Sequence, residues 1–171
     1  MEQISTKHPE AFARATSPAD VRRIATTDAV ALPMGMENGA GLGGTLENVQ
    51  RFYDRGIRYI TLTHGKHNRI GDSSYDAAEP RWKGLSPFGT QVVAEMNRLG
   101  MMVDISHVTD ATARDVLAQT KAPVIASHSS CRHFTPAWER NVSDAILQGI
   151  AETGGVVMIT FGSSFLRNEY R

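Results

Sequence analysis

The sequence predicts an α/β fold in which parallel strands alternate with helices. Five short runs rich in apolar and β-branched residues have the length and composition of buried strands. Segments with helical spacing lie between them, and such alternation implies a parallel sheet with right-handed crossovers. The five runs are residues 29–36, 58–64, 101–107, 123–128 and 155–161.

Four segments between and beside these runs place their apolar residues on one helical face. Each begins near a residue that commonly caps a helix N-terminus, and two of them stop at a glycine, as helix C-termini often do. The segments are residues 46–55, 87–99, 109–119 and 143–152, with caps at Thr45, Ser86, Thr109 and Ser143 and glycines at Gly56 and Gly100.

The chain is short for a complete barrel of strand–helix units. An open doubly wound sheet also fits the alternation, but the glycine-rich segment 39–44 lacks the spacing of a dinucleotide-binding loop. The barrel is therefore favoured, although barrels of this kind take about 250 residues. We expect a single domain over residues 1–171, a partial (β/α)8 barrel of about five parallel strand–helix units.

The composition is that of an ordinary globular protein and excludes several partners. Eighteen basic side chains balance eighteen acidic ones, so charge gives no argument for nucleic acid. Cys131 is the single cysteine, which excludes an internal disulfide. The sequence has no apolar stretch of the roughly 20 residues that a transmembrane helix needs, and no signal peptide at its start. Localisation stays open: cytoplasmic, or exported if the natural N-terminus lies upstream.

Groups that bind metals stand at the ends of four predicted strands. Glu37 follows the first run, and His64, His107 and His128 end the next three. In a parallel sheet or barrel these ends meet at the rim where ligands bind. A lone histidine is most often structural, but four such groups in register are hard to assign to packing. A carboxylate with two imidazoles is a common ligand set of catalytic zinc.

Six motifs occur in a telling order: Gly-Met-Glu-Asn-Gly (35–39), Tyr-Ile-Thr-Leu-Thr-His (59–64), Gly-Leu-Ser-Pro-Phe-Gly (84–89), Val-Asp-Ile-Ser-His-Val (103–108), Ala-Ser-His-Ser-Ser (126–130) and Arg-Asn-Val-Ser-Asp (140–144). Together they resemble the membrane (renal) dipeptidase family of zinc metallopeptidases, within the amidohydrolase-like barrels. The resemblance runs from about Ala29 to the C-terminus and is looser before it.

The resemblance implies a binuclear zinc site that hydrolyses dipeptides through a metal-activated bridging water. Glu37 falls on the carboxylate that bridges the two metals, and His107 and His128 fall on ligands of the second zinc. His64 falls on a catalytic histidine that contacts the substrate and stabilises the oxyanion. Arg140 falls on the arginine that binds the substrate's C-terminal carboxylate, a role that suits a planar guanidinium.

Two parts of the family's site have no match in these 171 residues. The first zinc also takes a His-x-Asp pair from the opening strand of the barrel, and the sequence contains no His-x-Asp. The acidic proton shuttle comes from a late strand beyond Arg171. The chain thus resembles the middle portion of a dipeptidase, with N-terminal and C-terminal parts apparently missing, and we expect it to hold one metal rather than two.

Four other residues near the predicted rim each have a functional and a structural interpretation. Asp104 is expected to orient a ligand imidazole by accepting its second N–H, although a pairing inside the barrel is an equally simple interpretation. His67 is expected to be a solvated loop residue, with a place in the substrate pocket as the alternative. Trp82 and Trp138 either wall the substrate pocket or cap the core.

Two other functions compete with the dipeptidase. A related amidohydrolase would act on a lactone, ester or cyclic amide, but the position of Arg140 favours a substrate with a free carboxylate. Alternatively, the chain is a non-catalytic fragment whose exposed barrel edges associate with each other, since unpaired edge strands are prone to pairing. Both the enzyme and the self-associating fragment are compatible with a homo-oligomer.

Overall fold

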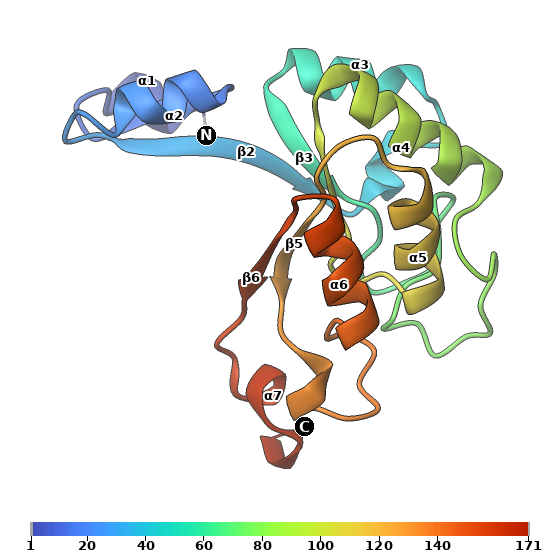
Figure 1. Cartoon of the computed structure of the whole chain (residues 1–171). Coiled ribbons are helices and arrows are strands. Elements are labelled where there is room, and N and C mark those ends of the chain that lie inside the picture. The colour runs from blue at the N-terminus through green and yellow to red at the C-terminus, as the bar shows by residue number, and fades with distance from the viewer. Residues whose placement is uncertain (1, 171) are drawn as a thin grey trace.

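A computed structural model describes residues 2–170 as six parallel strands in one curled sheet, with helices between the strands (Figure 1). The strand order in the sheet is the order in the chain, as in part of a (β/α)8 barrel. The predicted fold class is therefore confirmed. The strands are β1 (Phe12–Ala15), β2 (Val30–Glu37), β3 (Ile57–Thr61), β4 (Met102–Asp104), β5 (Ile125–Ser129) and β6 (Val156–Ile159).

The helices that follow β2, β3, β4 and β5 pack on one side of the sheet, and the N-terminal end of the chain forms an arm. In Figure 1 this arm contains α1, α2 and the beginning of β2, with which β1 pairs, and it extends away from the other elements. The helices are α1 (Glu2–Lys7), α2 (Pro18–Ile24), α3 (Glu47–Asp54), α4 (Pro87–Leu99), α5 (Asp110–Gln119), α6 (Asp144–Glu152) and α7 (Ser163–Leu166), with 3-10 turns η1 (Gly39–Leu42), η2 (Arg132–Phe134) and η3 (Asn168–Tyr170). Among the described residues, none of these helices is long and apolar enough to cross a membrane.

The sheet has one strand more than the five that the sequence predicts. Strand β1 is only four residues long, and three of them are half-buried, so it lacks an apolar run. Its pairing with β2 creates the strand: Phe12 lies beside Val30 and Ala15 beside Pro33. The second half of β2 pairs with β3 instead. A long-range pairing of this kind leaves little trace in local sequence.

The four predicted helices are present, and two of the four predicted caps act as expected. The hydroxyls of Ser86 and Thr109 accept hydrogen bonds from backbone N–H groups in the first turns of α4 and α5. Ser143 is the N-cap residue of α6, as predicted, but its hydroxyl makes no capping hydrogen bond. The prediction for Thr45 is wrong, because α3 begins after Leu46 and has no side-chain cap. Gly100 ends α4 with a left-handed φ of 74°, which glycine adopts without strain.

The hydrophobic core lies between the sheet and helices α3–α6. Alternate residues of the central strands, such as Ile60, Val103 and Ala126, pack against buried helix residues such as Val92 and Val116. The intervening strand residues face the concave side of the sheet. Because the strands are parallel, the C-terminal ends of β2, β4 and β5 lie at one rim of the sheet.

Candidate metal centre

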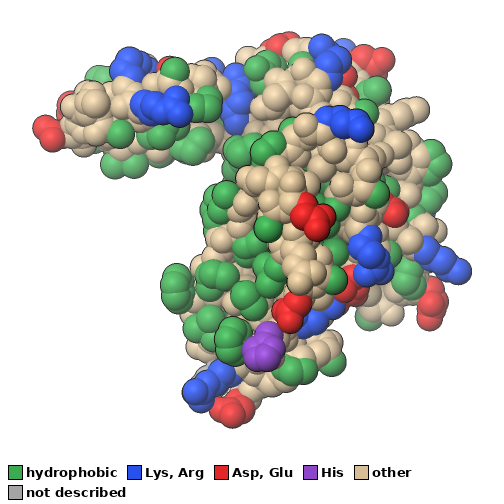
Figure 2. Space-filling view, in the orientation of Figure 1, with side chains coloured by type: hydrophobic (Ala, Val, Ile, Leu, Met, Phe, Trp, Pro, Cys, Tyr) green, Lys and Arg blue, Asp and Glu red, His purple; other side chains and the backbone are tan. Residues whose placement is uncertain are grey.

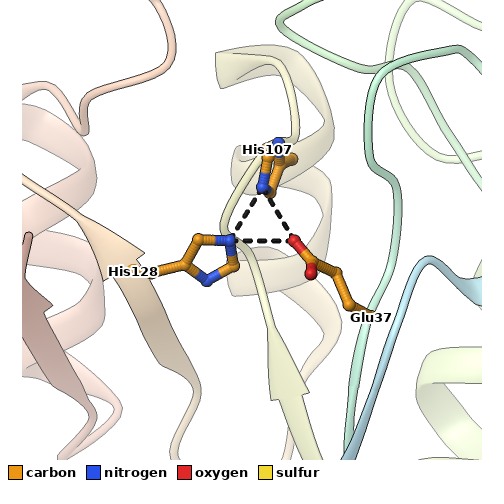
Figure 3. A group of neighbouring side chains, drawn as sticks. All are labelled: Glu37, His107 and His128. Carbon is orange, nitrogen blue, oxygen red and sulfur yellow. Dashed lines mark hydrogen bonds and ion pairs between the residues drawn. The ribbon is translucent and has the colours of Figure 1, made fainter. Parts of the chain in front are cut away.

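Three side chains from three neighbouring strand ends meet at this rim (Figure 3). Glu37 ends β2, His107 follows β4, and His128 lies in β5. Glu37 Oε1 lies 3.1 Å from His107 Nε2 and 3.0 Å from His128 Nε2. The two Nε2 atoms are 2.8 Å apart. Among the described residues this is the one group of three or more His, Cys, Asp or Glu side chains able to share a metal ion.

The donor set fits a zinc ion. Ligand atoms in a tetrahedral zinc site with bonds of about 2.0–2.1 Å lie about 3.3 Å apart, so the three atoms need to separate only slightly. A lone pair on each atom can point to their common centre, where a cation would relieve the repulsion between them. Glu37 is exposed and His128 half-buried, which leaves an open side for a water or a substrate.

Local backbone geometry aims the two imidazoles. The register between β5 and β6 shifts between Ala126 and Ser129, an irregularity of the kind that re-aims side chains next to active sites. His107 has a left-handed φ of 69°, which is uncommon for a residue with a Cβ. Its carbonyl accepts hydrogen bonds from Ser74 N–H at 2.8 Å, from the Ser74 hydroxyl and from the Thr63 hydroxyl. These three donors hold the unusual conformation.

The environment of His107 favours its neutral form. The side chain is 6% exposed, and burial is the main reason that its pKa falls from 6.5 to about 3. The positive charge of Arg140 and the neighbouring imidazoles of His128 and His64 lower the pKa further. A neutral imidazole is the form that binds a metal, so His107 is ready as a ligand without losing a proton.

Arg140 lies beneath the imidazoles, and only 2% of it is exposed. One terminal nitrogen donates to Ser129 Oγ at 2.7 Å, and the other donates to the carbonyl of His128 and lies 3.2 Å from His107 Nε2. Its Nε is buried and has no partner among the described residues. Burial also lowers the pKa of the guanidinium, with partial compensation from Tyr75 and from acidic neighbours.

His64 stands at the open side of the cluster. Its Nε2 lies 3.6 Å from Glu37 Oε1, and its ring centre lies 4.4 Å from that of His107. The side chain is 51% exposed. The structure therefore brings together all five residues that the sequence assigns to the site: Glu37, His64, His107, His128 and Arg140.

A family model described as membrane dipeptidase, peptidase family M19, matches residues 1–171. The chain belongs to the membrane dipeptidase family. It is 44% identical over 140 residues to an uncharacterized dipeptidase of Schizosaccharomyces pombe, across 81% of this chain and 33% of that protein.

Solved structures of similar proteins have the same fold. The probable dipeptidase PvdM of Pseudomonas aeruginosa is 32% identical, with a TM-score of 0.93 over 97% of this chain and 42% of that one. A metallo peptidase of Rhodobacter sphaeroides, bound to a phosphinate mimic of the dipeptide L-Ala-D-Ala, is 29% identical, with a TM-score of 0.90 over 99% of this chain and 49% of that one. The chain thus spans a third to a half of the length of these relatives.

In this member of the membrane dipeptidase family, Asp104 lies one hydrogen bond further from the candidate metal ligands than we expected. Its carboxylate accepts from the hydroxyls of Thr61 and Ser127 and from the backbone N–H groups of Ser106 and Ser127. The Ser127 hydroxyl stands between Asp104 and the imidazole of His128, whose Nδ1 is 2.7 Å away. Asp104 is fully buried.

The prediction that His67 is solvated is wrong. Its side chain is 7% exposed; Nδ1 accepts from Ser73 N–H at 2.9 Å, and Nε2 lies 3.2 Å from the carbonyl of Ala78. The loop between β3 and α4 folds back on itself around these contacts. Buried Asp72 completes it, because its carboxylate accepts from the N–H groups of residues 81, 82 and 84. The loop has no regular structure, but its polar groups are satisfied internally.

Two residues of the site have no counterpart among the sequence predictions. Ser127 precedes the candidate metal ligand His128, and its place in the Ala-Ser-His-Ser-Ser motif is the signal that marks it. Tyr75 lies 5.5 Å from the His107 ring, ring centre to ring centre, and carries no signal in its local sequence. Trp138 packs edge-on against Tyr75 and Phe165, near Arg140, whereas Trp82 donates its indole N–H to the Asn68 carbonyl within the loop.

Proposed function

We propose that this chain supplies a zinc site, formed by Glu37, His107 and His128, to a dipeptidase that hydrolyses the peptide bond of dipeptides. The convergence of these three ligand atoms within 3.1 Å of one another, beside a buried arginine, is the observation that supports the proposal most strongly. Zinc bound there would supply a Lewis acid for the scissile carbonyl and an activated water.

The remaining residues of the site bind and orient the substrate. His64 faces the open side, where an imidazole N–H can donate to the oxygen that becomes negative during hydrolysis. The unpartnered Nε of Arg140 is the donor left for the substrate's C-terminal carboxylate. Because this atom is buried, the carboxylate can reach it only if neighbouring side chains move. The ring centres of Tyr75 and Phe165 lie 5.9 Å and 5.0 Å from the guanidinium carbon.

These 171 residues supply ligands for one zinc. The sequence contains no His-x-Asp pair, and the described residues hold no second group of ligands. We therefore propose one zinc per chain, with a second metal depending on residues outside this sequence. In the relatives, the part of each chain that has no match here is longer than the part that does.

Zinc content and dipeptide hydrolysis test the proposal. We expect one equivalent of zinc per chain, lost in His107→Ala and in His128→Ala but kept in His133→Ala, whose imidazole is exposed in η2. Full zinc occupancy in either ligand variant would refute the ligand assignment. Hydrolysis of L-Ala-D-Ala that rises with bound zinc supports the dipeptidase, whereas a zinc-loaded chain without turnover contradicts that activity for these residues.

Substrate class is tested separately through Arg140. A dipeptide and its C-terminal amide differ only in the carboxylate that Arg140 would bind. We expect the amide to raise KM strongly for the wild-type chain and much less for Arg140→Gln, because glutamine has neither the positive charge nor the Nε–H of the guanidinium. Faster hydrolysis of a lactone or cyclic amide than of any dipeptide would instead favour the related amidohydrolase.

Self-association is a second candidate, supported by the apolar side chains along β6. Figure 2 shows hydrophobic side chains gathered on the β6 side of the molecule, and Val156, Met158 and Phe161 are exposed, the last by 82%. Among the described strands, β6 is at the edge of the sheet and pairs with β5 alone. We propose that two chains pair through this edge. Light scattering should show a dimer that Met158→Lys dissociates; a monomeric wild-type chain would contradict this proposal.

A further inference from the structure

The two Ser-His dipeptides at the rim look alike in sequence but make different contacts. Ser106 Oγ accepts a hydrogen bond from the backbone N–H of His128 at 3.0 Å, so it ties β4 to β5 without touching an imidazole. Ser127 Oγ instead lies 2.7 Å from Nδ1 of His128, the ring nitrogen that faces away from the metal cluster. Only the second serine is therefore in a position to act on a metal ligand.

The direction of the hydrogen bonds follows from Asp104. A carboxylate is an acceptor only, and this buried one receives four hydrogen bonds, including one from the Ser127 hydroxyl. A serine hydroxyl has one proton, and here that proton points to Asp104. Ser127 Oγ can then only accept from His128, which places the single N–H proton of the neutral ring on Nδ1. The lone pair of His128 is thereby on Nε2, 3.0 Å from Glu37 Oε1.

We propose that Ser127 is a positioning residue: it relays the Asp104 carboxylate to His128 and fixes the imidazole in the tautomer that presents Nε2 to the metal. This inference rests on the proposed zinc site. Metal-binding histidines commonly donate their other N–H to a carboxylate, carbonyl or water. In this chain Ser127 stands between the Asp104 carboxylate and the His128 imidazole. The carboxylate is held within the sheet because it also accepts hydrogen bonds from Thr61 and Ser106.

His107 has no such relay, which makes the two ligands unequal. Its Nδ1 is buried without a partner among the described residues. The carbonyl contacts of Ser74 and Thr63 hold its backbone, not its ring. Zinc affinity should therefore respond to the hydrogen bond on His128, the one ligand imidazole whose Nδ1 has a hydrogen-bond partner among the described residues.

The test compares zinc affinity, by chelator competition, in the 171-residue chain and four variants. Ser127→Ala removes the hydroxyl. Ser127→Thr and Ser127→Val introduce β-branched side chains of similar shape, of which threonine keeps the hydroxyl and valine lacks it. Ser106→Ala is the control, because it removes a buried rim hydroxyl that contacts backbone alone. We expect 10- to 100-fold weaker zinc binding in Ser127→Ala and Ser127→Val, as is typical for loss of such a partner, and near wild-type affinity in Ser127→Thr and Ser106→Ala.

A spectroscopic readout separates positioning from a general structural role. In the zinc-loaded wild-type chain, NMR should show a slowly exchanging Nδ1–H proton for His128, retained in Ser127→Thr and Ser106→Ala and fast-exchanging in Ser127→Val. Equal affinities in the Thr and Val variants, or a protected Nδ1–H in Ser127→Val, would overturn the inference while leaving the zinc site intact. A wild-type chain that binds no zinc would overturn the proposed function as well.

Discussion

Replacing Asp104 by asparagine tests how the buried carboxylate organises the rim. The new amide has one oxygen and one NH2 group in place of two oxygens. The two backbone N–H groups that Asp104 now binds, from Ser106 and Ser127, cannot rotate, so the amide oxygen must stay with them. The NH2 group then faces the hydroxyls of Thr61 and Ser127, which can turn and accept.

Turning the Thr61 and Ser127 hydroxyls toward the amide changes both the stability of the fold and the tautomer of His128. Four hydrogen bonds change from charge-assisted to neutral at about 1 kcal/mol each, and relief from burying a charge offsets part of the loss, so we expect the free energy of unfolding to fall by about 2–4 kcal/mol. The Ser127 proton now points to Nδ1 of His128, which forces the ring proton onto Nε2. Exchange of an orienting carboxylate for an amide produces a wrong tautomer in the same way in serine proteases.

We therefore expect Asp104→Asn to weaken zinc binding at least as much as the loss of the Ser127 hydroxyl, by about 10- to 100-fold. Urea unfolding of the metal-free chain measures the stability, and chelator competition measures the affinity. Asp110→Asn is the control, because Asp110 pairs with Arg132 away from the imidazoles; it should keep its zinc affinity. Wild-type affinity in a folded Asp104→Asn chain would refute the tautomer argument.

Three further predictions concern acid stability, packing and metal-linked stability. The pKa of His107 in the folded chain is about 3, so between pH 6.5 and 3 the unfolded chain binds a proton that the folded, metal-free chain does not. The free energy of unfolding should therefore drop by up to about 1.4 kcal/mol for each pH unit of acidification. The drop should be less steep in His107→Asn. Gly89→Ala should destabilise the chain by about 1–3 kcal/mol in urea, although alanine favours helices, because the new Cβ would lie 2.1 Å from the Ile70 carbonyl oxygen. Zinc at 100 times its Kd should add about 2.7 kcal/mol to the free energy of unfolding, and nothing in His128→Ala.

Local sequence was sufficient to predict the strands and helices that build the rim. Apolar runs that end in a polar residue place Glu37, His107 and His128 at strand ends, and parallel topology brings those ends together. The predicted strand at 101–107 was longer than β4, which ends at Asp104. The reason is the left-handed backbone of His107, which no apolar pattern reveals.

Features that depend on distant contacts could not be predicted in the same way. Strand β1 exists because it pairs with β2, and the burial of His67 depends on Ser73 and Ala78. The relay through Ser127 needs the spatial position of Asp104, which is 23 residues away along the chain. Residue types and order therefore predict which groups reach the rim, whereas the hydrogen bonds that orient them depend on the tertiary structure.

The Asp72 contacts of the β3–α4 loop also bear on proteolysis. Arg81 and Lys83 are exposed and basic, which makes this loop a natural target for trypsin. A protease must pull several residues into an extended shape before it can cut, yet the N–H groups of residues 81, 82 and 84 are bonded to a fully buried carboxylate. Cleavage there requires the loop to open, so slow digestion at Arg81 and Lys83 reports that the β3–α4 loop is folded.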